Sequence, residues 1–297
     1  MAQGNDKTSH SLSVAASFGF LYGEGEEIAY RNNLTDNKLS QLLWKFEPVF
    51  YIGAKLNYGW QFPSGKTGFF IDASLKYGIP NKLGLMEDRD WIIYAYPDFL
   101  THYSVHDIKT ESAILVDAHI GMAFSVTENI IIKPFIFYGF MHFKWTAKGG
   151  SFLYPDDDGG HFYLIDKIDA GNYKQTWNII GIGASVHYTF NELFDIEPFI
   201  KMSPFIWNNA LDNHLLLDDI YTDTMFGGFY IEYGFNFIIK ITNRFTTTVY
   251  VGGRNINGTR GDTVKKEKGK QPVKYPNMAG AGYNTLNIGI ITTYNLF

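Results

Sequence analysis

The segment FYIEYGFNFIIKI, residues 229 to 241, alternates apolar and other side chains along its whole length. Successive side chains of a β-strand point to opposite faces, so this alternation places the apolar ones on one face. Such a face is longer than a typical globular strand of about five or six residues provides. The segment therefore predicts a long strand with these residues on one side: Phe229, Ile231, Tyr233, Phe235, Phe237, Ile239 and Ile241.

A second segment, TWNIIGIGASVHY at residues 176 to 188, repeats the pattern and carries mostly small side chains on its other face. Periodicity leaves two architectures open. In a soluble sandwich the apolar face would form the core, whereas in a membrane barrel it would meet lipid and the polar face would fill the lumen. Strands of about ten residues with aromatic ends match a bilayer, which favours the barrel.

The composition of the 297 residues agrees with an all-β protein. Aromatic residues make up 17%, and 30 glycines are scattered along the chain, as expected for many strands joined by turns. No apolar run reaches the ~18 residues of a spanning helix. A net charge of −5 argues against a nucleic-acid partner, and the absence of cysteine excludes disulfides, thiolate chemistry and Cys-ligated metals. We expect one domain, residues 1–297.

The N-terminal residues MAQGNDKTSHS are polar and lack the apolar segment of a signal peptide. If the protein is exported, we expect its leader to have been removed.

Ten segments carry a strand pattern, and an even number suits a closed antiparallel transmembrane barrel with both chain ends on one side. We expect these strands at residues 10–30, 38–60, 66–80, 103–126, 129–150, 172–190, 193–209, 225–242, 244–258 and 281–297. Short connections predict tight periplasmic turns at 127–129, 191–194 and 242–244. Longer polar segments predict extracellular loops, with function in or just below them, at 81–102, 151–171, 210–224 and 259–280.

Two motifs in these polar segments carry groups suited to proton transfer. In ALDNHLLLDD, Asp212 and His214 are two residues apart, so in extended backbone they share a face, and Asp212 can orient His214 as a general base. In MEDRDW, Asp88 and Asp90 share a face while Arg89 points the other way. Two close carboxylates raise one another's pKa and can share a proton. Taken alone, each motif is also compatible with a solvated loop.

Other polar clusters predict no metal site. The run YPDDDGGH, residues 154 to 161, has three consecutive aspartates without the alternate spacing of an EF-hand loop, and we expect a solvated loop tip. His102, His106 and His119 lie in one hydrophilic strand region but lack a set of partner ligands.

Several motifs, in order along nearly the whole chain, make the sequence similar to one known family. It resembles the omptins, aspartate- and histidine-dependent proteases of Gram-negative outer membranes that fold as ten-stranded barrels. The matching stretches are SFGFLYGEGEEIAY (17–30), KLSQLLWKF (38–46), MEDRDW (86–91), WTAKGGS (145–151), DNH (212–214) and GAGYN (280–284).

The resemblance implies an aspartyl-type endopeptidase whose active site faces the cell exterior. Asp212 and His214 would form a dyad, and Asp88 and Asp90 an aspartate couple facing it across the barrel mouth. A water activated between the pairs would attack the peptide bond, without a covalent intermediate or a cofactor. The partners implied are polypeptide substrates and outer-membrane lipid, and we expect a monomer.

Substrate recognition departs from the family pattern. Omptins typically cleave beside basic residues through an acidic pocket, and Glu27 stands at one of its acids. Ala210 stands at the second acid, and His102 at a further acidic loop position. A preference for Arg or Lys is therefore expected, but relaxed or altered.

The residues expected to bind lipid also depart from the family pattern. Omptins depend on lipopolysaccharide bound to the outer wall of the barrel, and Tyr138 falls on one of the binding positions. Phe140 and His142 replace an acid and an arginine, so the phosphate-clamping set is incomplete and a weaker dependence is expected. Two other functions stay open on the same barrel: a catalytically degenerate adhesin or surface-binding protein, and a passive channel.

Overall fold

A computed structural model describes residues 8–32, 34–63, 65–154 and 161–297. The aspartates of the YPDDDGGH run lie outside these described residues. The described chain forms twelve strands, as follows: β1 Ser9–Tyr30, β2 Lys38–Gln61, β3 Thr67–Gly78, β4 Gly84–Asp90, β5 His102–Ser125, β6 Ile130–Tyr154, β7 His161–Thr189, β8 Phe194–His214, β9 Asp219–Phe226, β10 Phe229–Lys240, β11 Phe245–Glu267 and β12 Val273–Asn295. The all-β prediction is confirmed.

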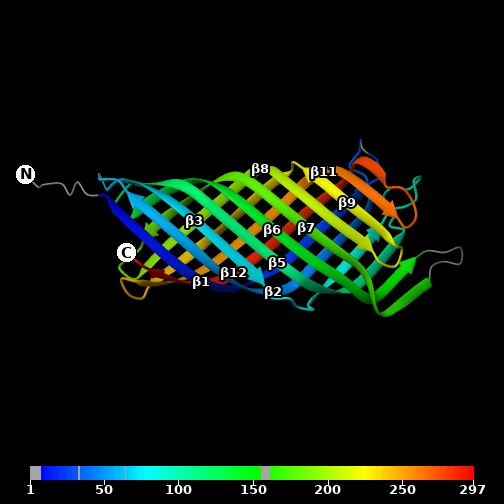
Figure 1. Ribbon diagram of the computed structural model, residues 1–297, viewed down its shortest axis with the longest axis horizontal. Helices are drawn as coiled ribbons and strands as arrows, with labels where there is room; N and C mark the ends of the chain where they lie inside the picture. Colours follow the sequence, from blue (N-terminus) through cyan, green and yellow to red (C-terminus); the bar gives the residue numbers. More distant parts are fainter. Residues whose placement is uncertain (1–7, 33, 64, 155–160) are drawn as a thin grey trace, which may run out of the picture.

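The strands form one antiparallel sheet that closes on itself (Figure 1). The first strand supplies the closure, because β1 pairs with β2 on one side and with β12 on the other. Ser13, for example, lies opposite Asn57 and Asn295 at once. Closure removes the unpaired edges that an open sheet would expose, and the strands run obliquely around the long axis.

The expected count of ten strands is wrong, because two positions in the ring are each divided into two strands. β3 and β4 both lie between β2 and β5, while β9 and β10 both lie between β8 and β11. Pro80, which cannot donate a backbone hydrogen bond, lies in the first interruption. Gly227 and Gly228, with φ of 88° and 85°, form the second.

The tight turns at 127–129, 191–194 and 242–244 are confirmed, but the expected loops are shorter than predicted. The segment 81–102 contains β4, and the segment 210–224 contains the end of β8 and most of β9. Strands β11 and β12 likewise extend through most of 259–280. The motifs expected in loops therefore lie on strands, where the register of the sheet fixes the direction of each side chain.

The alternation in residues 229–241 places apolar side chains on the outer surface and the intervening side chains toward the interior. Tyr233, Phe235 and Phe237 of β10 are 46–56% exposed, whereas Glu232 on the other face is 4% exposed. This arrangement is the reverse of a sandwich, in which the apolar face would be the core. Long apolar side chains are exposed in the same way on the neighbouring strands. No helix in the described residues is long and apolar enough to cross a membrane.

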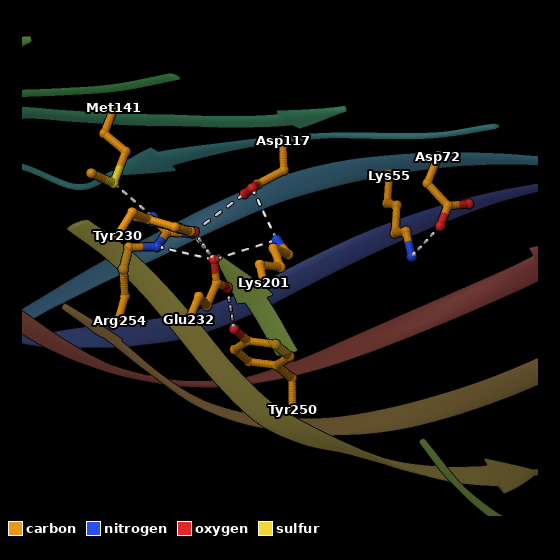
Figure 2. Close-up of polar contacts among 9 residues, drawn as sticks. All are labelled: Lys55, Asp72, Asp117, Met141, Lys201, Tyr230, Glu232, Tyr250 and Arg254. Atoms are coloured by element: carbon orange, nitrogen blue, oxygen red, sulfur yellow. Dashed lines mark hydrogen bonds and ion pairs between the residues drawn. The ribbon is translucent and has the colours of Figure 1, made fainter. Parts of the chain in front are cut away.

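A network of ion pairs lies in the interior, between side chains of different strands (Figure 2). Glu232 accepts hydrogen bonds from Arg254 Nη2 at 2.8 Å and from Tyr250 Oη at 3.0 Å. Lys201 Nζ lies 3.3 Å from Glu232 and 3.1 Å from Asp117, and Arg254 lies 3.5 Å from Asp117. Buried charges are tolerated only when paired in this way, so the lumen is occupied by a compensated network.

An aromatic layer lies between this network and the open end formed by β4 and β9. Trp44 stacks on Tyr173 with ring centroids 5.4 Å apart, and Phe143 stacks on Trp145 at 5.3 Å. Phe46 contacts both Phe143 and Trp145. The layer is almost fully buried and forms the floor of the mouth.

The ion network gives a test of the fold. Replacing Glu232 by Gln leaves Lys201 and Arg254 with Asp117 as their remaining carboxylate, so we expect a loss of about 3–5 kcal/mol of unfolding free energy. Urea unfolding in detergent micelles measures the change. Lys148→Gln, at an exposed pair with Asp169, is the matched control and should leave the midpoint unchanged. Equal stability of the two variants would contradict this account.

Candidate active site

Strand β4 carries Asp88 and Asp90 into the interior of the mouth. Asp88 lies between Leu42 of β2 and Ser104 of β5, and Ser40 Oγ is 3.5 Å from its Oδ1. The alternation of the strand turns the intervening residues outward, where Glu87 pairs with Arg89 and Lys45. This orientation of the two aspartates is the one that the MEDRDW spacing predicts.

Strand β8 carries Asp212 and His214 toward the same space. Asp212 is 2% exposed, and its Oδ2 forms an ion pair with His214 Nε2. Asp212 lies opposite Tyr173 of β7 and Tyr221 of β9, and the ring of Tyr221 lies 5.2 Å from the imidazole. The hydrogen bond and the adjacent ring hold His214 in one orientation.

The two walls face each other across one cavity. Three strands separate β4 from β8 along one arc of the ring, namely β5, β6 and β7, and the longer arc runs through β2, β1, β12, β11 and β9. Asp88, Asp212 and His214 all line a cavity of about 220 Å³. Asp90 lies one step further along β4, opposite His102. The structure therefore brings the two sequence motifs together around a common space.

Burial and neighbouring charges shift the titration of this site. Burial alone disfavours the imidazolium, but Asp212, Asp88 and Asp219 outweigh it and raise the pKa of His214 to about 9. Burial, together with Asp90, raises the pKa of Asp88 to about 7. Burial also raises the pKa of Asp90. Near neutral pH the cavity thus holds exchangeable protons on both walls, which is the requirement for acid and base catalysis on a water.

A second histidine in the cavity was not predicted from the sequence. His106 Nδ1 contacts the carbonyl oxygen of Gly149, which fixes its tautomer, and Ser104 Oγ donates to Nε2 at 3.0 Å. Both side chains are about 5% exposed and line the wall beside Asp88. The two-residue spacing of Ser104 and His106 was visible in the sequence, but only the register with β4 places them at the site.

Two acids of β9 were also missed, Asp219 and Asp223. Asp219 lies opposite His214, and Asp223 lies opposite Ala210. The alternation in DIYTDTMF would have found them if the segment 210–224 had been interpreted as a strand.

The remaining sequence candidates lie apart from the His214 cavity. Glu27 is 8% exposed and lines a second cavity of about 280 Å³ in the mouth. Tyr138 is 40% exposed on the outer wall and donates to Asn178 Oδ1 at 2.7 Å, and His142 there lies 3.0 Å from Thr176 Oγ1. Within the described residues, no group of three or more His, Asp or Glu side chains is placed to hold a metal ion.

Comparison with known proteins identifies the family to which this chain belongs. The sequence model of the omptin family matches residues 8–296. The plasminogen activator of Yersinia pestis is 27% identical over 87% of this chain and 81% of its own length. The outer membrane protease OmpP of Escherichia coli K12 is 23% identical over 96% of this chain and 89% of its own.

A solved structure shows the same fold. The outer membrane protease OmpT from Escherichia coli superposes with a TM-score of 0.86 at 21% identity, covering 96% of this chain and 97% of that chain. Since the family model spans nearly the whole described sequence, this chain belongs to the omptin family.

Proposed function

We propose that this protein is an outer-membrane endopeptidase that hydrolyses peptide bonds at the extracellular mouth of its barrel. The outer-membrane location agrees with the exposed apolar belt and with the names of the relatives. The observation that carries the proposal is the single cavity shared by Asp88 and the Asp212–His214 pair. Hydrolysis by direct attack of water needs a water held between a base and a group that stabilises the tetrahedral intermediate, and we assign these roles to His214 and Asp88.

In the proposed mechanism His214, oriented by Asp212, removes a proton from a water as that water attacks the scissile carbonyl. Asp88 and Asp90 position the water and stabilise the negative oxygen of the tetrahedral intermediate through a shared proton or through hydrogen bonding. His214 then returns its proton to the leaving amine, and the carbon–nitrogen bond breaks. Oxygen from water ends in the new carboxylate, and no bond to the enzyme forms.

The substrate residue beside the scissile bond is proposed to be basic. Glu27 is buried, and its Oε2 has no hydrogen-bond partner among the described residues. An arginine or lysine side chain is the natural partner of such a carboxylate, because a charge-assisted hydrogen bond offsets the cost of its burial.

A peptide-library digest with mass-spectrometric reading of the cleavage sites tests this function. We expect cleavage beside Arg or Lys, and loss of about 10²–10⁴-fold in kcat/KM for His214→Ala and for Asp88→Ala, since each removes a proton-transfer group. The control is His10→Ala, at the opposite end of the barrel, where His10 contacts Tyr58.

The digest, together with a surface-binding assay and a conductance measurement, separates the three alternatives. Turnover that depends on His214 and Asp88 but not on His10 supports the endopeptidase. Absence of cleavage of any peptide, with surface binding that survives both substitutions, would identify a degenerate adhesin instead. Ion conductance in planar bilayers without proteolysis would point to a channel.

The charges around His214 predict a shift in the pH–rate profile. A raised pKa keeps His214 protonated at neutral pH, so the general base forms only as the pH rises. The rise of kcat/KM on the acid side of the pH–rate profile therefore reports the deprotonation of His214. Asp219→Asn removes one charge that raises the pKa, so the limb should move to lower pH by up to about one unit. Glu267→Gln is the control, because Glu267 shares Lys265 with Asp219. A limb that stays in place in Asp219→Asn, or moves to higher pH, would show that His214 is not the base.

Activity is proposed to depend only weakly on lipopolysaccharide. Phe140 and His142 on the outer wall lack the charge pairing that would clamp phosphate, although Tyr138 is exposed beside them. The purified protein in lipid bilayers free of lipopolysaccharide should therefore retain most of its activity. Activity that appears only when lipopolysaccharide is added would overturn this proposal.

A further inference from the structure

The second cavity of the mouth is lined by two buried carboxylates from distant strands. It has a volume of about 280 Å³ and lies between β1, β9, β11 and β12, with Glu27, Tyr30, Tyr221, Asp223 and Lys265 among its lining residues. Glu27 is 8% exposed and Asp223 is 4% exposed. Both side chains therefore lie where an ionised carboxylate is costly unless a partner compensates it.

The partners that would neutralise these acids are missing from the described residues. Glu27 Oε2 has no hydrogen-bond partner although it is shielded from solvent. Asp223 forms no ion pair with a described cation, and the neutral hydroxyl of Thr263 is its polar side-chain partner. Lys265, the cation of the cavity, is already bound to Asp219 at 2.9 Å and to Glu267 at 3.1 Å. The pocket thus carries an excess of negative charge.

The titration of the two acids agrees with a site suited to a cation. Burial, with Asp212, Asp223 and Asp88 adding to it, raises the pKa of Glu27 well above its ordinary value. Burial likewise raises the pKa of Asp223 to about 6. Protons compensate the carboxylates when no other cation is present, and a positively charged side chain that entered would displace them.

The side chain of Tyr221 lies next to both the acidic cavity and the proposed catalytic pair. Tyr221 lines the acidic cavity. The centroid of its ring lies 5.2 Å from the centroid of the His214 ring. Asp223 follows Tyr221 by two residues on the same face of β9. A substrate residue whose carbonyl lies at His214 can therefore extend its side chain past Tyr221 to the acids.

The register places Asp223 beside Ala210, the position at which the family's second pocket acid is absent from this sequence. Ala210 on β8 brings no charge to the pocket, but Asp223 lies directly opposite it on β9. Side chains of directly opposed residues lie on one face with Cβ atoms about 4.5–5.5 Å apart. A carboxylate at either position enters the same space.

We propose that Asp223 is a specificity-determining residue, which together with Glu27 binds the guanidinium or ammonium group of the substrate residue next to the scissile bond. The inference rests on the proposed endopeptidase function and deepens it, because it identifies the second carboxylate of the basic-residue pocket. Moving the acid from β8 to β9 keeps the pocket doubly acidic in spite of Ala210.

The test compares two peptides that differ only in charge, one with arginine at the cleavage position and one with citrulline. For Asp223→Asn we expect kcat/KM on the arginine peptide to fall about 10- to 100-fold, the effect of one charge-assisted contact, with little change on the citrulline peptide. Adding Ala210→Asp to Asp223→Asn should restore the preference for arginine. Asp218→Asn, an exposed residue of the β8–β9 turn paired with Lys268, is the matched control and should behave as wild type.

A second variant separates charge from packing. Asp223→Glu keeps the carboxylate and should keep the preference for arginine, so a loss seen only in Asp223→Asn is a loss of charge. Equal loss on both peptides, or no loss on either, would overturn the role of Asp223 while leaving an arginine-selective wild type intact. A wild type that cleaves neither peptide would overturn the proposed function itself, and the inference with it.

Discussion

The two-residue alternation of side chains within a closed hydrogen-bonded ring is the constraint on which the rest of the molecule depends. Because β1 pairs with both β2 and β12, no strand can slip by one residue without turning its apolar side chains inward. The same alternation directs Asp88 with Asp90, and Asp212 with His214, into the mouth. The chemistry at the mouth is therefore fixed by the periodicity that also exposes Tyr233 and Phe235 on the outside.

The alternation made much of the architecture predictable. The segment 229–241 identified one strand almost residue by residue, and the short turns gave the order of the hairpins. The sequence did not reveal β4 and β9, because Pro80 and the pair Gly227–Gly228 interrupt the pattern there. The register between strands was also hidden. Asp223 belongs to the same pocket as Glu27 only because β9 pairs with β8 and β11, a relation that spacing along one strand cannot show.

Buried carboxylates are paired with cations in the middle of the interior, whereas some of those at the mouth are not. In the middle, Glu232 and Asp117 are matched by Lys201 and Arg254, so their burial is compensated. At the mouth Glu27, Asp88 and Asp223 have no ion pair with a Lys or Arg of the described residues, and burial raises the pKa of Asp88 to about 7. Unmatched buried carboxylates are unfavourable for stability, and their concentration above the aromatic floor is typical of a functional site and not of a purely structural interior.

The central claim is that a water activated between Asp88 and the Asp212–His214 pair attacks the peptide bond directly. Trapping with hydroxylamine during turnover tests it, because an acyl-enzyme would partition between water and the added nucleophile. Direct attack predicts that every new carboxyl terminus takes one oxygen from labelled water and that no hydroxamate forms at any hydroxylamine concentration. Hydroxamate that increased in proportion to hydroxylamine would demonstrate a covalent intermediate and contradict the mechanism.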